Sequence, residues 1–130
     1  MEECMNETTR AGIGLRIKRR AMRWMYGAQG TGLPRIAEAF RRRTARWAVE
    51  HSDEALVWID DFCGNRYFCC DLSEHMGSQI YFKGSYSGGQ LVVLRQLLTP
   101  EAVFVDAGAN QGEFTVCAAG CVPEGHAFAF

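Results

Sequence analysis

Long apolar runs are missing from this chain. No window approaches the ~18 consecutive apolar residues that a membrane-spanning helix needs. The basic stretch at residues 16–23 is not followed by the apolar core of a secretory signal. We therefore expect a cytoplasmic protein that does not bind a membrane. With 48% hydrophobic and 12% aromatic residues, the 130-residue chain has enough apolar material for a globular core.

Metal-ligand spacing is also missing, although the chain has six cysteines. No C-x-x-C pair occurs, and the adjacent Cys69 and Cys70 would point to opposite faces of a strand. Cys117 and Cys121 lie one helical turn apart, which is half of a zinc site at best. Without a secretion signal, disulfides are not expected either. We expect reduced cysteines that pack as small apolar side chains, and no metal.

Acidic residues are scarce in residues 10–46, where eleven Lys and Arg residues accompany a single acid, Glu38. Apolar residues recur there at helical spacing in two segments, separated by the turn-like residues 27–34. In the second segment the face opposite the apolar one carries Arg41, Arg42 and Arg46. We therefore expect two amphipathic helices with solvated basic faces.

Two interpretations of these basic helices are open. Arginine-rich amphipathic helices can bind nucleic acid or an anionic membrane surface. The alternative is a solvated basic face on helices whose aromatic side chains, Trp24, Phe40 and Trp47, dock on the rest of the protein. We favour the second, because aromatic and basic side chains do not alternate along one face as they do on single-stranded RNA platforms. Nucleic acid is therefore not the expected partner.

Strand character prevails between residues 55 and 81. The runs LVWI and RYFCC flank the turn-like DFCGN, which predicts a β-hairpin, and a third short strand is expected at residues 79–82. Residues 86–98 have leucines at helical spacing and end in Thr-Pro, which predicts an amphipathic helix. The expected organisation has three parts: a basic helical region (1–54), a β-rich subdomain (55–85) and the start of a further domain (86–130).

The segment VFVDAGANQG, residues 103–112, is the most informative part of the chain. Its apolar run predicts a buried strand that ends at Asp106, and glycines follow before the helical segment 113–121. A strand, a glycine-containing turn and a helix form the first half of a βαβ unit, in which a ligand can lie against bare backbone. A side chain at Gly108 would occupy the space that such a ligand needs.

Three classes of ligand use such a turn, and the spacing separates them. A P-loop requires a lysine after its last glycine, but Gly112 is followed by Glu113 and Phe114. A dinucleotide fingerprint requires G-x-G-x-x-G, whereas Asn110 and Glu113 stand at its second and third glycines. Glu113 would also place a negative charge where pyrophosphate binds a helix N-terminus. The remaining pattern, D-x-G-x-N-x-G, resembles motif I of class I S-adenosylmethionine-dependent methyltransferases. The alternative is a turn with packing glycines that binds no ligand.

Several motifs in the same order make residues 56–130 similar to the FkbM family of methyltransferases. That family typically shows Ile-Tyr-x-x-Gly-x-Tyr, then Asp-x-Gly-Ala-Asn-x-Gly, then Pro-Glu-Gly before the next strand. The matching residues are Ile80, Tyr81, Gly84 and Tyr86, then Asp106, Gly108, Ala109, Asn110 and Gly112, and then Pro123, Glu124 and Gly125. Ser87 departs from the family, which commonly carries an acidic residue at that position.

This resemblance implies a fold, a cofactor and a site. The fold would be α/β: an incomplete Rossmann-like class I methyltransferase fold, preceded by N-terminal helices and a small β-hairpin region. The reaction would be O-methylation of a hydroxyl on a sugar or secondary metabolite, a small-molecule acceptor, with S-adenosylmethionine as the methyl donor. The resemblance assigns no catalytic base to this part of the chain. The cofactor-binding residues would be Asp106, Gly108, Asn110, Gly112 and Tyr86.

Each of these residues has an implied role. Gly108 and Gly112 would let the cofactor approach the backbone closely, and Asp106 would hold the cationic amino end of its methionyl group. Asn110 would orient the turn or add a polar contact, and Tyr86 would wall the site. Transfer of a methyl group in this way depends mainly on positioning the two reactants.

The last apolar segment, HAFAF at residues 126–130, is expected to be a second strand. In the family an acidic residue that binds the cofactor ribose comes next. Parallel strands normally have both faces covered by helices, so we expect the chain to be the N-terminal part of a longer enzyme and inactive alone. Two other functions remain open: a nucleotide-binding oxidoreductase fragment of the same fold, and a non-enzymatic module that binds nucleic acid through the basic helices.

Overall fold

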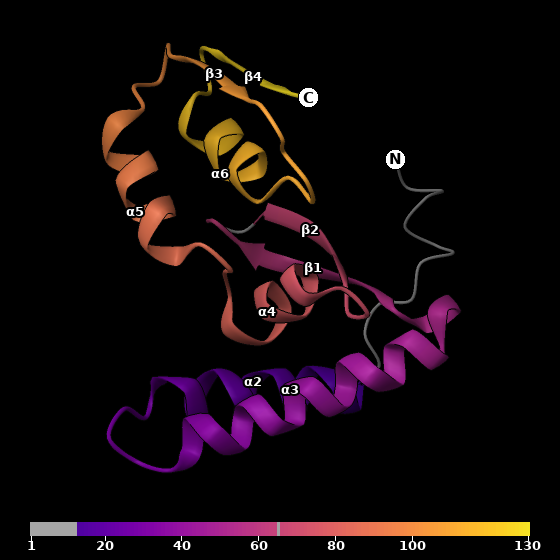
Figure 1. Ribbon diagram of the computed structural model, residues 1–130. Coiled ribbons are helices and arrows are strands. Elements are labelled where there is room, and N and C mark those ends of the chain that lie inside the picture. Colours follow the sequence, from indigo (N-terminus) through magenta and orange to yellow (C-terminus); the bar gives the residue numbers. More distant parts are fainter. Residues whose placement is uncertain (1–12, 65) are drawn as a thin grey trace. The chain divides into compact units, whose positions relative to one another are not determined.

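The computed structural model describes residues 13–64 and 66–130 and shows a mixed α/β protein (Figure 1). Its helices are α2 (Ile13–Gly27), α3 (Leu33–Glu50), α4 (His75–Lys83), α5 (Gly88–Leu97) and α6 (Glu113–Cys121), with a short 3-10 helix at Ser52–Glu54. Its strands are β1 (Leu56–Phe62), β2 (Arg66–Asp71), β3 (Val103–Asp106) and β4 (His126–Ala129). The first two strands form one sheet and the last two form another. Cys4, one of the six cysteines, and Asn65, in the turn of the predicted hairpin, lie outside the described residues.

The chain divides into two compact units. The first unit consists of Met1–Ile59 and Cys69–Gly84, and the second of Asp60–Phe68 and Ser85–Phe130. The hairpin of β1 and β2 therefore contributes its base to the first unit and its tip to the second. Within the described ranges, no helix combines the length and the apolar character that crossing a membrane requires.

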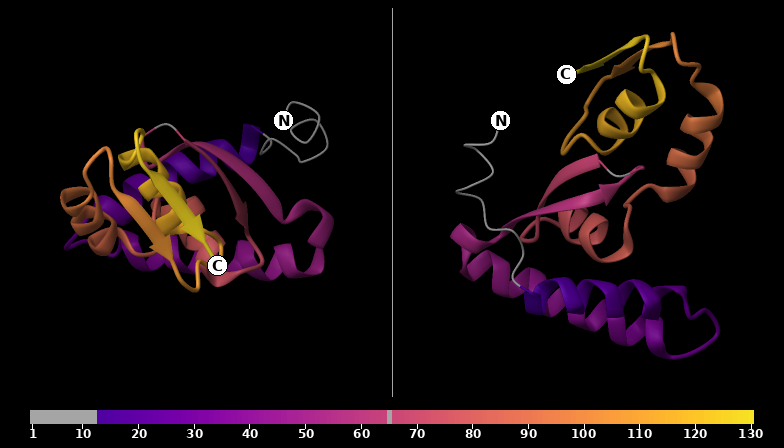
Figure 2. Two further views of the ribbon diagram at one scale, coloured as in Figure 1. Left: turned by 90° about the horizontal axis from the view of Figure 1, so that it is seen from above. Right: turned by 180° about the vertical axis from the view of Figure 1, so that it is seen from behind.

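In the first unit, α2 and α3 form an antiparallel helical hairpin that packs on α4 (Figure 2). Both helices lie where the apolar spacing predicts them, and Pro34 stands in the first turn of α3, a position that proline favours. The Arg19 side chain of α2 donates a hydrogen bond from Nε to the Tyr81 carbonyl of α4, at 2.8 Å. This bond joins the basic helical region to the segment that follows the hairpin.

The strand predicted at residues 79–82 is wrong, because these residues belong to α4. Their aromatic and β-branched side chains favour a strand locally, but three consecutive residues, Ile80, Tyr81 and Phe82, are all buried. Gly84 ends the helix in the left-handed conformation, with a φ of 96°, and its N–H donates to the Ile80 carbonyl at 2.9 Å. Helix packing and this glycine cap therefore override the local strand preference.

The expectation for the faces of α2 and α3 is also wrong in part. Trp24 and Phe40 are not docked on the rest of the protein, since 70% and 56% of their surfaces remain exposed, whereas Trp47 stacks on His51 and is 38% exposed. The side of α3 that is buried consists of Ala37, Arg41 and Ala48. Small residues let neighbouring helices approach closely, and the long Arg41 side chain finds a partner within that contact: its Nη1 donates to the Ser78 hydroxyl of α4 at 2.7 Å.

In the second unit, β3 and β4 run parallel, with Val103 opposite His126 and Asp106 opposite Ala129. Helix α6 packs on both strands and α5 packs on α6 (Figure 1). The strand, the two helices and the final strand thus lie where the sequence predicts them. The expectation that β3 is buried is wrong, since Val103 and Val105 remain 64% and 57% exposed.

Candidate cofactor-binding turn

The turn between β3 and α6 has three residues in the left-handed region of backbone space. Gly108, Asn110 and Gly112 have φ values of 85°, 50° and 81°. Glycine adopts this conformation without a steric penalty, and asparagine tolerates it better than most other residues. The backbone path therefore explains why glycine, asparagine and glycine occupy alternate positions in the motif.

Open space surrounds the two glycines of the turn. A Cβ atom built on Gly108 or Gly112 meets no atom of the described chain within 4 Å. Gly125, in the turn before β4, is different, since its Cβ would lie 2.0 Å from the Ala102 carbonyl oxygen. Gly125 is therefore required by packing, whereas Gly108 and Gly112 leave their backbone accessible. The left-handed backbone, and not close packing, therefore accounts for these two glycines within the turn.

Asp106 is the last residue of β3, and its carboxylate stands at the carboxyl end of the strand. The hydroxyl of Thr115, in the first turn of α6, donates a hydrogen bond to Asp106 Oδ2. The Asp106 carbonyl accepts a bond from the Phe130 N–H at 3.0 Å. Helix α6 thus holds the half-buried side chain of Asp106, while Phe130 holds its backbone. Thr115 was not among the predicted site residues, although a hydroxyl in the first turn after the motif is a local signal that could have indicated it.

Glu113 is buried, with 1% of its surface exposed. Its carboxylate accepts hydrogen bonds from the backbone N–H groups of Tyr86, at 2.6 Å, and Ser87, at 3.0 Å. The first residue of α6 is therefore tied to the segment that precedes α5. The sequence suggested Glu113 only as a charge that disfavours phosphate, and its role as an anchor could not be read from the motif.

Tyr86 is brought to the start of α6 by this anchor. Its N–H is bound by Glu113, while 47% of its surface remains exposed. Ser87, where the resembling family commonly carries an acid, is the N-cap residue of α5 and supplies its own N–H to Glu113. Of the five predicted residues, four therefore lie in one turn, and the fifth is connected to that turn through a single carboxylate.

The turn also contains polar groups that lack partners. The side-chain oxygen Oε1 of Gln111 is buried and has no hydrogen-bond partner within the described part of the chain. No side chain caps the N-terminus of α6, whose first N–H groups have no acceptor inside the helix. The N–H groups of Gly108 and Ala109 are not available, because both donate to the Phe130 carbonyl. An unpaired acceptor and the helix N-terminus are thus the polar groups that a ligand of this turn could use.

Known proteins give no independent assignment of this turn: neither the protein families, nor the curated proteins, nor the solved structures with which the chain was compared match it. The residues that could bind a ligand are therefore identified from their geometry. The chemistry present there is the carboxylate of Asp106, the buried carboxylate of Glu113, open space over two glycines and an unpaired amide oxygen.

No cysteine belongs to the turn itself. Burial raises the pKa of the Cys63 thiol to about 12, and burial also raises the pKa values of Cys69 and Cys121. Such thiols are protonated at neutral pH and are poor nucleophiles. In residues 13–64 and 66–130, no three His, Cys, Asp or Glu side chains gather in a way that could hold a metal ion.

Proposed function

We propose that this chain carries the cofactor-binding turn of an S-adenosylmethionine-dependent O-methyltransferase of FkbM type, within a Rossmann-like fold. The observation that carries the proposal is the open space over Gly108 and Gly112 beside the carboxylate of Asp106. Ligands of open parallel α/β sheets bind outside the carboxyl ends of the strands, which is where this turn lies. A packing role explains Gly125 but neither of these two glycines.

The charges around the turn favour a ligand without phosphate groups. Glu113 keeps a carboxylate in the first turn of α6, where a phosphate would otherwise bind the helix N-terminus. Asp106 adds a second carboxylate at the end of β3. S-adenosylmethionine has a positively charged sulfur and amino group and no phosphate. These charges support it over the dinucleotide of an oxidoreductase.

Each residue would contribute to positioning. When bound, S-adenosylmethionine would supply a methyl group on a positively charged sulfur, for displacement by a hydroxyl of a sugar or secondary metabolite. Asp106 would accept hydrogen bonds from the amino group, with Thr115 fixing the orientation of its carboxylate. Tyr86, held by Glu113, would form part of the wall. The contribution of such residues is to hold two reactants at reacting distance.

Calorimetric titration of the chain with S-adenosylmethionine tests the proposal, using Gly108→Val and a matched control. Gly30 is that control, because its φ of 80° is nearly the same and its Cβ would also meet nothing within 4 Å. Valine at either site strains the backbone equally, so a general effect on folding would appear in both variants. We expect Gly108→Val to weaken binding by at least about 100-fold and Gly30→Val to leave it unchanged.

Two results would contradict the proposal. Equal affinity in the two variants would place the cofactor elsewhere on the chain. Tighter binding of NADH than of S-adenosylmethionine would favour the nucleotide-binding oxidoreductase instead.

A further inference from the structure

The helical hairpin of the first unit exposes a set of large apolar side chains. We call it the α2–α3 face; its members are Ile17 (64% exposed), Trp24 (70%), Ile36 (48%), Phe40 (56%) and Trp47 (38%). On α2 the two members are seven residues apart, and on α3 the spacings are four and seven, so each helix presents one stripe. Isolated exposed apolar residues are ordinary, but two aligned stripes that include two tryptophans are not.

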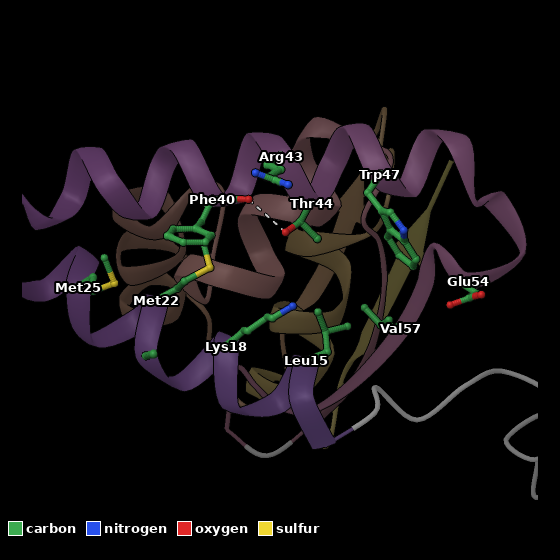
Figure 3. A pocket seen from close by; sticks show the side chains of 11 residues that line it. Leu15, Lys18, Met22, Met25, Phe40, Arg43, Thr44, Trp47, Glu54 and Val57 are labelled. Carbon is green, nitrogen blue, oxygen red and sulfur yellow. Dashed lines mark hydrogen bonds between the residues drawn. The ribbon is translucent and has the colours of Figure 1, made fainter.

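A groove of about 570 Å³ between the helices lies beside these stripes. Met22 and Met25 line its α2 side, and two members of the α3 stripe, Phe40 and Trp47, line its α3 side, so apolar side chains of both helices line the groove. Figure 3 shows Phe40 close to Met22, and Lys18 reaching from α2 toward α3. The groove therefore adds depth to the face and places a cation inside it.

Positive charge borders the face, and most of it is not neutralised by the protein. Five exposed cations lie in or beside the stripes: Lys18, Arg20, Arg35, Arg43 and Arg46. No ion pair joins any of them to an acid among the described residues, whereas Arg41 and Arg42 both bind Glu38. Among the residues that the structure describes, Glu54 is the one acid that lines the groove. The face therefore combines exposed apolar area with an excess of positive charge.

We infer that the α2–α3 face docks on the surface of a membrane rich in anionic lipid. Helices with Lys and Arg on one side and Trp, Phe and Ile on the other lie in the membrane interface, with the apolar side among the acyl chains. Tryptophan is favoured there because its ring is apolar and its N–H is polar. Lys18 and Arg43 can extend their aliphatic stems along the groove and place their charges among the headgroups. The proposal is independent of the methyltransferase function.

A nucleic acid is the alternative partner, and it fits the face less well. A nucleic acid would neutralise the cations but would leave Ile17, Ile36 and the groove exposed to water. From the sequence the opposite was expected: no membrane partner, and aromatic side chains docked on the rest of the protein. The exposure of Trp24 and Phe40 contradicts that docking.

Flotation of the whole chain with lipid vesicles tests the inference. We expect binding to phosphatidylcholine vesicles that contain about one-third phosphatidylserine, and little binding to pure phosphatidylcholine. The double variant Lys18→Gln/Arg43→Gln should weaken binding by about 25-fold, because each cation near an anionic surface contributes about fivefold. Raising the salt concentration should weaken binding of the unmodified chain in the same direction.

The apolar part of the face has its own matched control. Trp24→Ala and Val49→Ala both remove an exposed apolar side chain, from residues 70% and 65% exposed. Val49 lies nine residues from Phe40 and so on the opposite side of α3. Trp24→Ala should weaken vesicle binding about tenfold, and Val49→Ala should not change it. Since Trp24 is largely exposed, unchanged helical circular dichroism should accompany the loss.

Three outcomes would overturn the inference. These are equal binding to neutral and anionic vesicles, equal effects of Trp24→Ala and Val49→Ala, and the absence of vesicle binding. If that absence came with a concentration-dependent rise in molecular mass that Trp24→Ala abolishes, the face would be an interface between two copies of the chain.

Discussion

Each unit of this protein anchors one glutamate, but the two glutamates are satisfied in different ways. Glu38 in the first unit is bound entirely by side chains: Arg41, Arg42 and the hydroxyl of Tyr26 all donate to it. Glu113 in the second unit is bound by two backbone N–H groups. When Glu38 is lost, the exposed Arg42 can turn toward water and the buried Arg41 keeps its bond to Ser78, whereas a backbone N–H fixed in the chain cannot reorient. We therefore expect Glu113 to be the less replaceable of the two.

The largest effect is expected for Glu113→Ala. This change leaves the N–H groups of Tyr86 and Ser87 without an acceptor and opens a cavity at a residue that is 1% exposed. The free energy of unfolding should fall by about 3 kcal/mol, measured by urea denaturation. Glu113→Gln should recover part of the loss, because the amide oxygen still accepts a hydrogen bond. Equal losses for both variants would show that charge, and not hydrogen bonding, is what the site requires.

A smaller effect is expected for Glu38→Ala. Arg41 keeps its hydrogen bond to Ser78 after the change, and the exposed Arg42 can turn to solvent. Because the buried Arg41 loses its carboxylate partner but keeps Ser78, the loss should be about 2 kcal/mol. Amide hydrogen exchange distinguishes the two glutamates: protection should fall in α2, α3 and α4 for Glu38→Ala, and in α5 and α6 for Glu113→Ala. A larger loss for Glu38→Ala than for Glu113→Ala would reverse the comparison.

Within the second unit, sequence reasoning could find the local elements but not the partners of Glu113. The strand, turn and helix around Asp106 depend on local spacing, and the structure confirms those elements. The partners of Glu113 lie 26 and 27 residues away in the sequence, so no motif could indicate them. The assignment of Gly108 and Gly112 to a cofactor stays a prediction.

The first unit was predicted less well, again because contacts between residues far apart in the sequence decide which faces are buried. Helical spacing places Arg41 on the polar face of α3, and only the packing against α4, 37 residues away, makes that face buried. Residues 79–82 look like a strand by composition until the cap at Gly84 is known. Local pattern predicted the helices here, but not which of their faces meet. For the same reason, the exposure of the aromatic side chains on the α2–α3 face was not predicted.

The Glu38 cluster should make stability depend on pH at both ends. Hydrogen bonding to Arg41 holds the pKa of Glu38 well below its ordinary value of 4.5, so its stabilisation is present above that pH and is lost as the pH falls toward the folded-state pKa. Burial and the neighbouring Glu38 raise the pKa of Tyr26 above its ordinary value of 10.0. The stabilisation from neutral Tyr26 is therefore present below pH 10.0 and is lost as the pH rises toward the folded-state pKa.

Melting temperatures measured across this range check both directions. Glu38→Gln should flatten the acid side of the profile, and Tyr26→Phe should flatten the alkaline side. An unchanged acid side in Glu38→Gln would mean that another carboxylate controls acid unfolding.

The smallest effect on stability is expected for Thr115→Val, which removes one hydrogen bond to Asp106 while keeping the shape of the side chain. Asp106 is half-buried, so water can replace the hydroxyl, and the free energy of unfolding should fall by about 1 kcal/mol or less. The effect on S-adenosylmethionine should be larger, because a carboxylate that is free to turn binds an amino group less well. Calorimetry should show about tenfold weaker binding, against an unchanged affinity in Glu38→Ala, which alters an anchor in the other unit. A loss of stability without any loss of affinity would make the Thr115–Asp106 bond a feature of the fold alone.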